Sequence, residues 1–191
     1  MNIIYIILGL VFLLALYLVG IYNCLVTLRM RVKEAFADID VQLKKRYDLL
    51  PDLVETAKRA VKLDEDLLTK ITAIRSQAMT AHENNVSPEE QGKIETQLSN
   101  AVGQLRVQVE AYPDIKSHQE LLTLMDKTTE IEEKISYARR FYNSQVLGYN
   151  TSRQQFPVVL FAEMLGFNAE KFFEADESER ADVKISFDES Q

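Results

Sequence analysis

Few residues of this 191-residue chain stand at spacings that could support catalysis or metal binding. His82 and His118 have no Cys, His or Glu partner at metal-ligand spacing, and His82-Glu83 lacks the second histidine of a zinc-protease motif. Paired acids such as Glu132-Glu133 could transfer protons, but acids on helices are usually solvated. The sequence has no glycine-rich phosphate loop and no nucleophile elbow. We therefore predict no catalytic residue, no metal site, no cofactor and no small-molecule substrate.

One group of polar residues follows a single line along a predicted helix, beside its apolar stripe. Glu132, Arg139, Asn143 and Asn150 stand at spacings of seven, four and seven residues. Arg46 falls within the apolar arc of an earlier helix, where an unpaired charge would be very costly. Either these side chains reach water, or Arg46, Glu132, Arg139 and Asn143 form a structural polar layer in which Arg46 pairs with Glu132.

A second pattern consists of small residues on another predicted helix. Gly92, Thr96, Ser99 and Gly103 stand at spacings of four, three and four residues and face away from the expected core positions. Glycine inside a helix costs about 1 kcal/mol relative to alanine, so a groove that admits another helix would be a reason to keep it. The alternative is that the glycines are simply tolerated at the surface.

The elements that carry these residues begin with an apolar segment. Residues 3–28 contain no charged side chain, and about 20 such residues cross the roughly 30 Å of a bilayer core. No basic segment precedes the run, so residues 1–24 are expected to form a retained anchor and not a cleaved signal peptide. Arg29, Arg31 and Lys33 follow the run, which predicts an outside N-terminus and a cytoplasmic domain.

Beyond the anchor, apolar residues recur every three or four positions, which is typical of amphipathic helices. The pattern predicts an all-α fold in which residues 25–173 form an antiparallel bundle of about four long helices. The first stripe continues through Pro51, so we expect the anchor and the first bundle helix to be nearly continuous. Helix starts are predicted near Asp64 and at Ser87-Pro88, and a turn is predicted at residues 112–116.

The C-terminal part is expected to be less regular. A short apolar helix is predicted over residues 158–165, after which Phe167, Phe172 and Phe173 should dock on the bundle. Residues 174–191 form an acidic tail with seven acids against Arg180 and Lys184. The net charge of the chain is −7 and no basic stripe is present, so nucleic acid is not expected as a partner.

Several motifs, in the right order along nearly the whole chain, resemble the LemA family of bacterial membrane-anchored proteins. The resemblance is carried by Tyr22-Asn23, by residues 39–54 from Ile39-Asp40-Val41-Gln42 to Pro51-Asp52-Leu53-Val54, by Tyr112-Pro113-Asp114, by Ala138-Arg139-Arg140-Phe141-Tyr142-Asn143, by Tyr149-Asn150 and by Phe156-Pro157. Phe141 and Asp52 depart from the residues that are usual in the family. The resemblance implies a single span of the bacterial inner membrane and a cytoplasmic helical bundle, without an established enzymatic activity.

The sequence therefore predicts a scaffold or interaction protein that contacts the lipid bilayer and either a membrane protein or a second copy of itself. The resemblance adds that family members are often encoded near membrane-bound zinc metalloproteases, which implies modulation of such proteins. One alternative is a single-pass sensor or signal transmitter, in which the continuous first helix relays a change across the membrane. A hydrolase is the weakest alternative because no nucleophile constellation supports it.

Overall fold

The computed structural model describes residues 2–60, 64–111 and 118–173. Along these residues run the helices α1 (Asn2–Ala60), α2 (Glu65–Glu83), α3 (Pro88–Ala111), α4 (Gln119–Gln154) and α5 (Val159–Ala162). The described ranges contain no strand, and the predicted all-α fold is confirmed. The predicted turn at residues 112–116 and the acidic tail lie outside the described residues.

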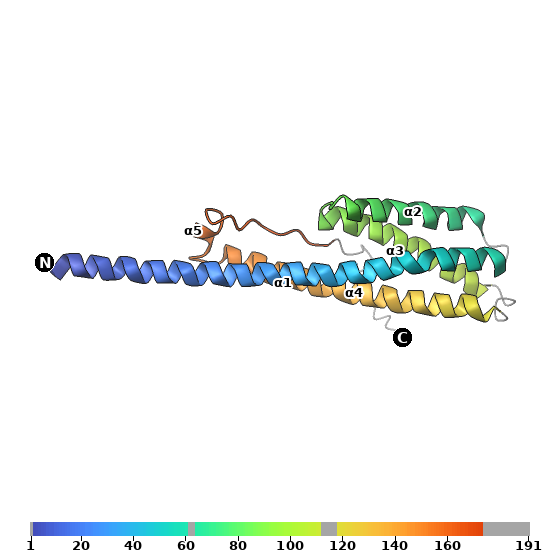
Figure 1. The fold of residues 1–191 in the computed structure, drawn as a ribbon, viewed down its shortest axis with the longest axis horizontal. Helices are drawn as coiled ribbons and strands as arrows, with labels where there is room; N and C mark the ends of the chain where they lie inside the picture. Colours follow the sequence, from blue (N-terminus) through green and yellow to red (C-terminus); the bar gives the residue numbers. More distant parts are fainter. Residues whose placement is uncertain (1, 61–63, 112–117, 174–191) are drawn as a thin grey trace, which may run out of the picture.

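Four long helices run up and down against one another. Helices α1 and α4 form an extended antiparallel pair, and the α2–α3 hairpin packs on this pair at the end remote from the N-terminus (Figure 1). This arrangement is the expected antiparallel bundle, which allows each helix to bury its apolar stripe against its neighbours. Its core includes Ile39, Leu43, Leu50, Leu53, Leu68, Ile71, Leu98, Leu105, Leu121, Ile135 and Val146.

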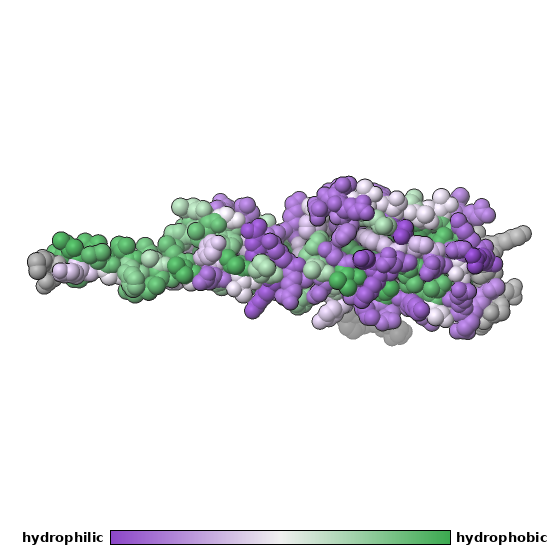
Figure 2. Space-filling model, viewed as in Figure 1, coloured by the Kyte–Doolittle hydropathy of each residue, from purple (hydrophilic) through white to green (hydrophobic). Residues whose placement is uncertain are grey.

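Helix α1 continues without interruption from the apolar N-terminal segment into the bundle. Its 59 residues correspond to a length of about 90 Å at 1.5 Å per residue. The first part exposes nearly all of its apolar side chains (Figure 2). From Ile21 onward, α1 has a buried apolar stripe. Among the described residues, α1 is the helix that is long and apolar enough to cross a membrane.

Pro51 lies inside α1 without ending it. Proline has no backbone N–H, so the carbonyl of Tyr47, four residues earlier, loses its helical donor. Arg75 of α2 supplies the replacement: its Nε donates a hydrogen bond to the Tyr47 carbonyl oxygen at 2.7 Å. The α2–α3 hairpin is thus attached to α1 at the position where the α1 ladder is incomplete.

The helix starts follow the residue types that the sequence offers for capping. The Asp64 carboxylate accepts a hydrogen bond from the backbone N–H of Asp66 at 2.9 Å, at the start of α2. The Ser87 hydroxyl accepts one from the backbone N–H of Glu90 at 3.3 Å, at the start of α3. Both starts agree with the predicted ones, because these side chains satisfy N–H groups that have no partner within the helix.

The segment after α4 differs from the prediction. Helix α5 has only four residues, and residues 167–173 run back toward the bundle as an extended segment (Figure 1). Hydrogen bonds from Asn143 and Asn150 hold this segment on α4. Phe167 and Phe173 are buried in the core, but Phe172 is exposed. The expectation that all three would dock is wrong for Phe172, because adjacent side chains of an extended segment point to opposite sides.

Candidate functional site

Arg46 of α1 is fully buried at the meeting point of three helices. Its Nη1 donates hydrogen bonds to Glu132 Oε1 of α4 at 2.7 Å and to Ser99 Oγ of α3 at 2.9 Å. Its other terminal nitrogen, Nη2, pairs with Glu95 Oε2 of α3. The structure therefore brings Arg46 and Glu132 together, with two carboxylates around a cation that could not be buried alone.

Glu95 is the central acceptor of this site, and the sequence-based prediction did not include it. Its side chain is fully buried and accepts hydrogen bonds from the Tyr47 hydroxyl and, at 3.1 Å, from Gln91 Nε2. One signal could have identified it: Glu95 falls within the apolar arc that Ile94 and Leu98 define on α3. We use the name polar cluster for Arg46, Tyr47, Gln91, Glu95, Ser99 and Glu132.

Tyr47 donates within the polar cluster because its hydroxyl stays protonated. Burial raises the pKa of Tyr47 to about 12, and the nearby Arg46 charge opposes this shift only in part. At neutral pH the phenol is therefore a hydrogen-bond donor to Glu95. The cluster contains one guanidinium that pairs with two carboxylates, and neutral groups donate further hydrogen bonds to these carboxylates. Such a network favours one register of the helices.

The small-residue line does not form one external face. Gly92 is buried and Ser99 points into the polar cluster, where its hydroxyl also donates to Glu132 Oε2 at 2.8 Å. Thr96 is half-buried, and Gly103 alone of the four is exposed, with open space where a Cβ would be. The expectation that all four face away from the core is wrong for Gly92 and Ser99, because α3 packs on more than one neighbour and buries a wide arc.

Asn143 and Asn150 bind the backbone of the extended segment 167–173. The Asn143 amide donates to the Phe173 carbonyl at 3.0 Å and accepts from its N–H at 2.8 Å. The Asn150 amide makes the same pair with Glu170, at 2.9 and 3.0 Å. Seven residues of helix rise about 10.5 Å and three residues of extended chain about 10 Å, so the two spacings match.

Two tyrosines repeat this seven-to-three match. Tyr142 donates to the Lys171 carbonyl at 2.8 Å, and Tyr149 donates to the Asn168 carbonyl at 2.8 Å. Burial raises the pKa of Tyr142 and of Tyr149, which keeps both hydroxyls protonated as donors. Side chains of α4 thereby provide a hydrogen-bond partner for a segment that has no neighbouring strand.

Arg139 lies between the two sites on α4. Its guanidinium carbon is 5.1 Å from the centroid of the Phe173 ring, a distance typical of a cation–π contact. Its charge also opposes, to a small extent, the rise that burial causes in the pKa of Tyr47. The predicted polar line therefore serves two places: Glu132 contacts Arg46 in the polar cluster, whereas Asn143 and Asn150 hold the extended segment.

The histidines show no metal-ligand geometry in the described part of the chain. His82 Nδ1 lies 3.6 Å from Asp40 Oδ1, and both side chains are partly exposed. Burial raises the pKa of Asp40, while the neighbouring His82 acts in the opposite direction. No group of three His, Cys, Asp or Glu residues is placed to bind a metal ion within the described ranges.

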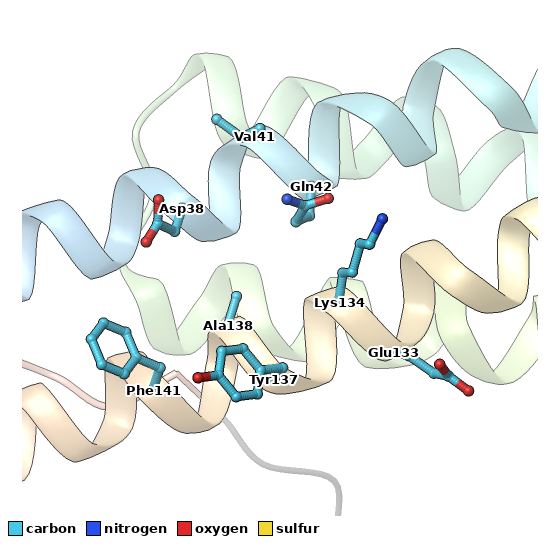
Figure 3. A pocket seen from close by; sticks show the side chains of 8 residues that line it. All are labelled: Asp38, Val41, Gln42, Glu133, Lys134, Tyr137, Ala138 and Phe141. Carbon is cyan, nitrogen blue, oxygen red and sulfur yellow. The ribbon is translucent and has the colours of Figure 1, made fainter.

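A groove of about 470 Å³ lies between α1 and α4. Its lining comes from both helices: Asp38, Val41, Gln42, Glu133, Lys134, Tyr137, Ala138 and Phe141 (Figure 3). Val41, Tyr137 and Phe141 are apolar or aromatic and exposed. Charged side chains flank them, so the groove has a mainly apolar lining with charged groups beside it, as protein-binding surfaces commonly have.

The sequence of this chain is similar to those of known proteins. A sequence profile of the LemA family matches residues 35–187. Protein LemA of Metamycoplasma hominis is 27% identical over 168 residues, which cover 88% of this chain and 75% of the relative. Magnetosome proteins MamQ 1 and MamQ 2 of Paramagnetospirillum magneticum are each 23% identical over 175 residues, and the match covers 80% of this chain and 64% of each relative, less than two thirds of their length. Because the profile covers most of the sequence, the chain belongs to the LemA family.

Proposed function

We propose that this protein is a single-pass membrane-anchored interaction module, whose bundle docks a helix of another membrane protein in the groove between α1 and α4. The observation that carries the proposal is the exposed apolar lining of this groove, on a bundle that is joined to an apolar helix. Exposed large apolar side chains that cluster inside a groove mark a contact surface, unlike single ones scattered over a protein.

The anchor is the exposed apolar part of α1, and residues 3–22 match the thickness of a bilayer core. The basic residues Arg29, Arg31 and Lys33 follow this segment, which favours a bundle on the cytoplasmic side of the bacterial inner membrane. Two of the relatives carry the name magnetosome protein, which supports a membrane-associated role without naming a partner.

The chemistry of the groove favours a helical partner. Its walls are two antiparallel helices, and a third helix can place an apolar stripe against Val41, Tyr137 and Phe141 while polar groups meet Asp38, Glu133 and Lys134. The bundle would modulate the position or the stability of such a partner. A membrane metalloprotease is one candidate that the family resemblance offers. A second copy of this chain is the competing occupant.

A photo-cross-linking amino acid at position 137 tests the proposal in the full-length protein in its native membrane. We expect a defined cross-linked species in which mass spectrometry identifies peptides of one unlike membrane protein beside those of this chain. A matched control carries the same group at Lys70, an exposed position on α2. Equal products from both positions would exclude a specific groove, and a product of exactly two copies would identify self-association.

One structural feature favours a second function, signal transmission. Helix α1 is uninterrupted from Asn2 to Ala60, so a rotation or shift of the apolar part would move the groove and the polar cluster with it. Two glycines inserted between Cys24 and Leu25 would decouple the two parts. Unchanged partner cross-linking from position 137 in that variant would favour a tether over a transmitter.

A further inference from the structure

The hairpin that follows α4 exposes a contiguous set of large apolar side chains. Within residues 156–165, here called the apolar hairpin, Phe156 is 81% exposed, Leu160 58% and Met164 85%. Val159 and Leu165 are exposed on the same short stretch. Single exposed apolar residues are ordinary, but five in ten residues form a patch that a soluble surface rarely carries.

The other side of the apolar hairpin is fixed to the bundle. Ala162 is buried, and Val158 and Phe161 pack against the hydrophobic core. Gly166, with a φ of 78°, turns the chain back toward α4 immediately after the hairpin. The exposed side chains are therefore held outward by a packed base.

The apolar hairpin lies beside α1 at the level where the exposed apolar surface of α1 ends. The ring of Phe167, just after the hairpin, meets the ring of Tyr22 edge-on with 5.4 Å between the centroids. Tyr22 is the last residue of the roughly 30 Å that residues 3–22 would span. The apolar surface continues from α1 onto α5 in the space-filling view (Figure 2).

The apolar hairpin carries few charged groups. Glu163 is the one charged residue within residues 156–166, and its Oε1 lies 3.5 Å from Nη1 of Arg153 at the end of α4. Arg29 of α1 is near this level as well, and its Nε pairs with Glu170 Oε1 at 3.1 Å. Each of these two arginines is paired with a glutamate, so an apolar surface stands beside a zone of charged and polar groups, as in elements that lie at the boundary between acyl chains and headgroups.

We propose that the apolar hairpin inserts into the cytoplasmic headgroup and acyl boundary of the same bilayer that α1 crosses, as a second membrane contact. The inference rests on the proposed anchoring of α1, since the bilayer is the surface that continues from it. One helix alone leaves the bundle free to tilt and rotate about its anchor. A second contact at the side of α1 fixes the height and orientation of the bundle, and with them the direction in which the α1–α4 groove opens.

Fluorescence quenching by spin-labelled lipids tests this contact in the full-length chain. Cys24 is the single cysteine, so Cys24→Ser provides a background for one new cysteine at a time. Met164→Cys carries an environment-sensitive fluorophore in phosphatidylcholine and phosphatidylglycerol vesicles that contain lipids spin-labelled at a shallow acyl carbon. We expect a blue-shifted emission and at least a twofold loss of intensity relative to vesicles without spin label.

Two reference positions separate the possible failures. Leu8→Cys lies in the apolar part of α1 and should be quenched by spin labels placed deep in the acyl chains, whereas Val107→Cys, an exposed position on α3, should not be quenched at any depth. Quenching at position 8 without quenching at position 164 would overturn the hairpin contact and leave the anchor intact. An unquenched label at position 8 would overturn the anchor and the hairpin contact together.

A substitution in the hairpin provides an independent check. Leu160→Glu places a charge on the exposed face without removing a buried side chain, so the bundle keeps its helicity by circular dichroism. With the label at position 164, this change should reduce quenching at least twofold while quenching at position 8 stays the same. Equal quenching at position 164 with and without the charge would contradict insertion.

Discussion

The guanidinium of Arg46 on α1 and the carboxylate of Glu95 on α3 pair with each other where neither side chain reaches solvent. A cation and an anion that are buried together attract each other strongly, but each has lost its hydration. Removal of one therefore leaves the other as a buried charge without a counter-ion, which destabilises the fold. The remaining groups of the polar cluster make hydrogen bonds with these two side chains. Three helices thus depend on one arginine for their mutual register.

Arg46→Ala should reduce the free energy of unfolding by about 3 to 5 kcal/mol, because it leaves Glu95 buried without its counter-ion. The measurement is urea unfolding of the detergent-solubilised protein, followed by circular dichroism. Arg59→Ala is the matched control: Arg59 pairs with Glu55 at the exposed end of α1, and its loss should cost about 1 kcal/mol or less. Equal effects of the two substitutions would contradict a stabilising buried pair.

Tyr47→Phe should change the response of stability to alkaline pH. Burial raises the pKa of Tyr47 to about 12 in the folded protein, above the value of about 10 in the unfolded chain. A raised folded pKa gives stability that is present below pH 10 and is lost as the pH rises toward 12, because only the unfolded chain ionises readily. The wild type should therefore lose about 2 kcal/mol more than the variant between pH 9 and 12.

The same unfolding experiment, repeated across this pH range, checks the prediction. Tyr142 also has a raised pKa and remains in both proteins, so Tyr47→Phe should retain part of the alkaline decline. Below pH 9 the variant should be less stable than the wild type, since Glu95 loses the hydroxyl donor. Parallel pH profiles of the two proteins would show that the Tyr47 phenol titrates equally in the folded and unfolded states.

The helices could be predicted from the sequence because their causes are local. Apolar residues at spacings of three and four, Asp64 and Ser87 as caps, and Pro51 as a tolerated interruption depend on neighbours within a turn or two. The partner of the Tyr47 carbonyl could not be predicted in the same way. Arg75 reaches that carbonyl only because α2 crosses α1 at this height, which is a property of the packed bundle.

For the same reason, the polar cluster can be predicted from the sequence only in part. Arg46 and Glu132 stand out as charges within or beside apolar arcs, so their meeting could be anticipated from helix periodicity. The apolar stripe of α3 predicts an outward Ser99, because helix periodicity identifies only the part of the buried face that apolar residues mark. In the bundle α3 packs on α2 and also contacts Arg46 of α1 and Glu132 of α4, so Ser99 falls within a wider buried arc.

Gly103→Leu separates the two interpretations of the small-residue line. The position is exposed, and the space where a side chain would begin is empty, so the larger residue should not disturb the fold. Better helix propensity should raise the free energy of unfolding by up to about 1 kcal/mol. Because Ser99 and Gly92 are turned inward, we expect cross-linking of the intact protein in membranes to remain as in the wild type. Loss of a cross-linked species in this variant would instead support a contact between this face of α3 and another helix.

Fusion of topology reporters after Gln191 should show a cytoplasmic C-terminus. The basic residues near the span all follow it, and such residues stay on the cytoplasmic side. A reporter that is active only in the cytoplasm should therefore be active, and one that is active only in the periplasm should be silent. Substitution of Arg29, Arg31 and Lys33 by Gln should weaken the preference for a cytoplasmic C-terminus and produce mixed topology. Activity of the periplasmic reporter in the wild type would reverse the proposed orientation.

Asn143→Leu should release one end of the extended segment without unfolding the bundle. The substitution removes a donor and an acceptor, so the backbone N–H and carbonyl of Phe173 both lose their partner on α4. Two such hydrogen bonds contribute about 1 to 3 kcal/mol together. Amide hydrogen exchange should become faster at Phe173 but remain slow at Glu170, which Asn150 still holds. Asn150→Leu should reverse this pattern.

Asn143→Asp is the sharper variant of the same test. A carboxylate can still accept a hydrogen bond from the Phe173 N–H, but it cannot donate to the Phe173 carbonyl. Exchange at Phe173 should therefore stay close to the wild-type rate while stability falls, because the carbonyl now faces a charged acceptor. Ser144→Ala, at an exposed position one residue further along α4, should leave both quantities unchanged. If Asn143→Leu and Ser144→Ala gave the same exchange rate at Phe173, the amide of Asn143 would not be what holds the segment on α4.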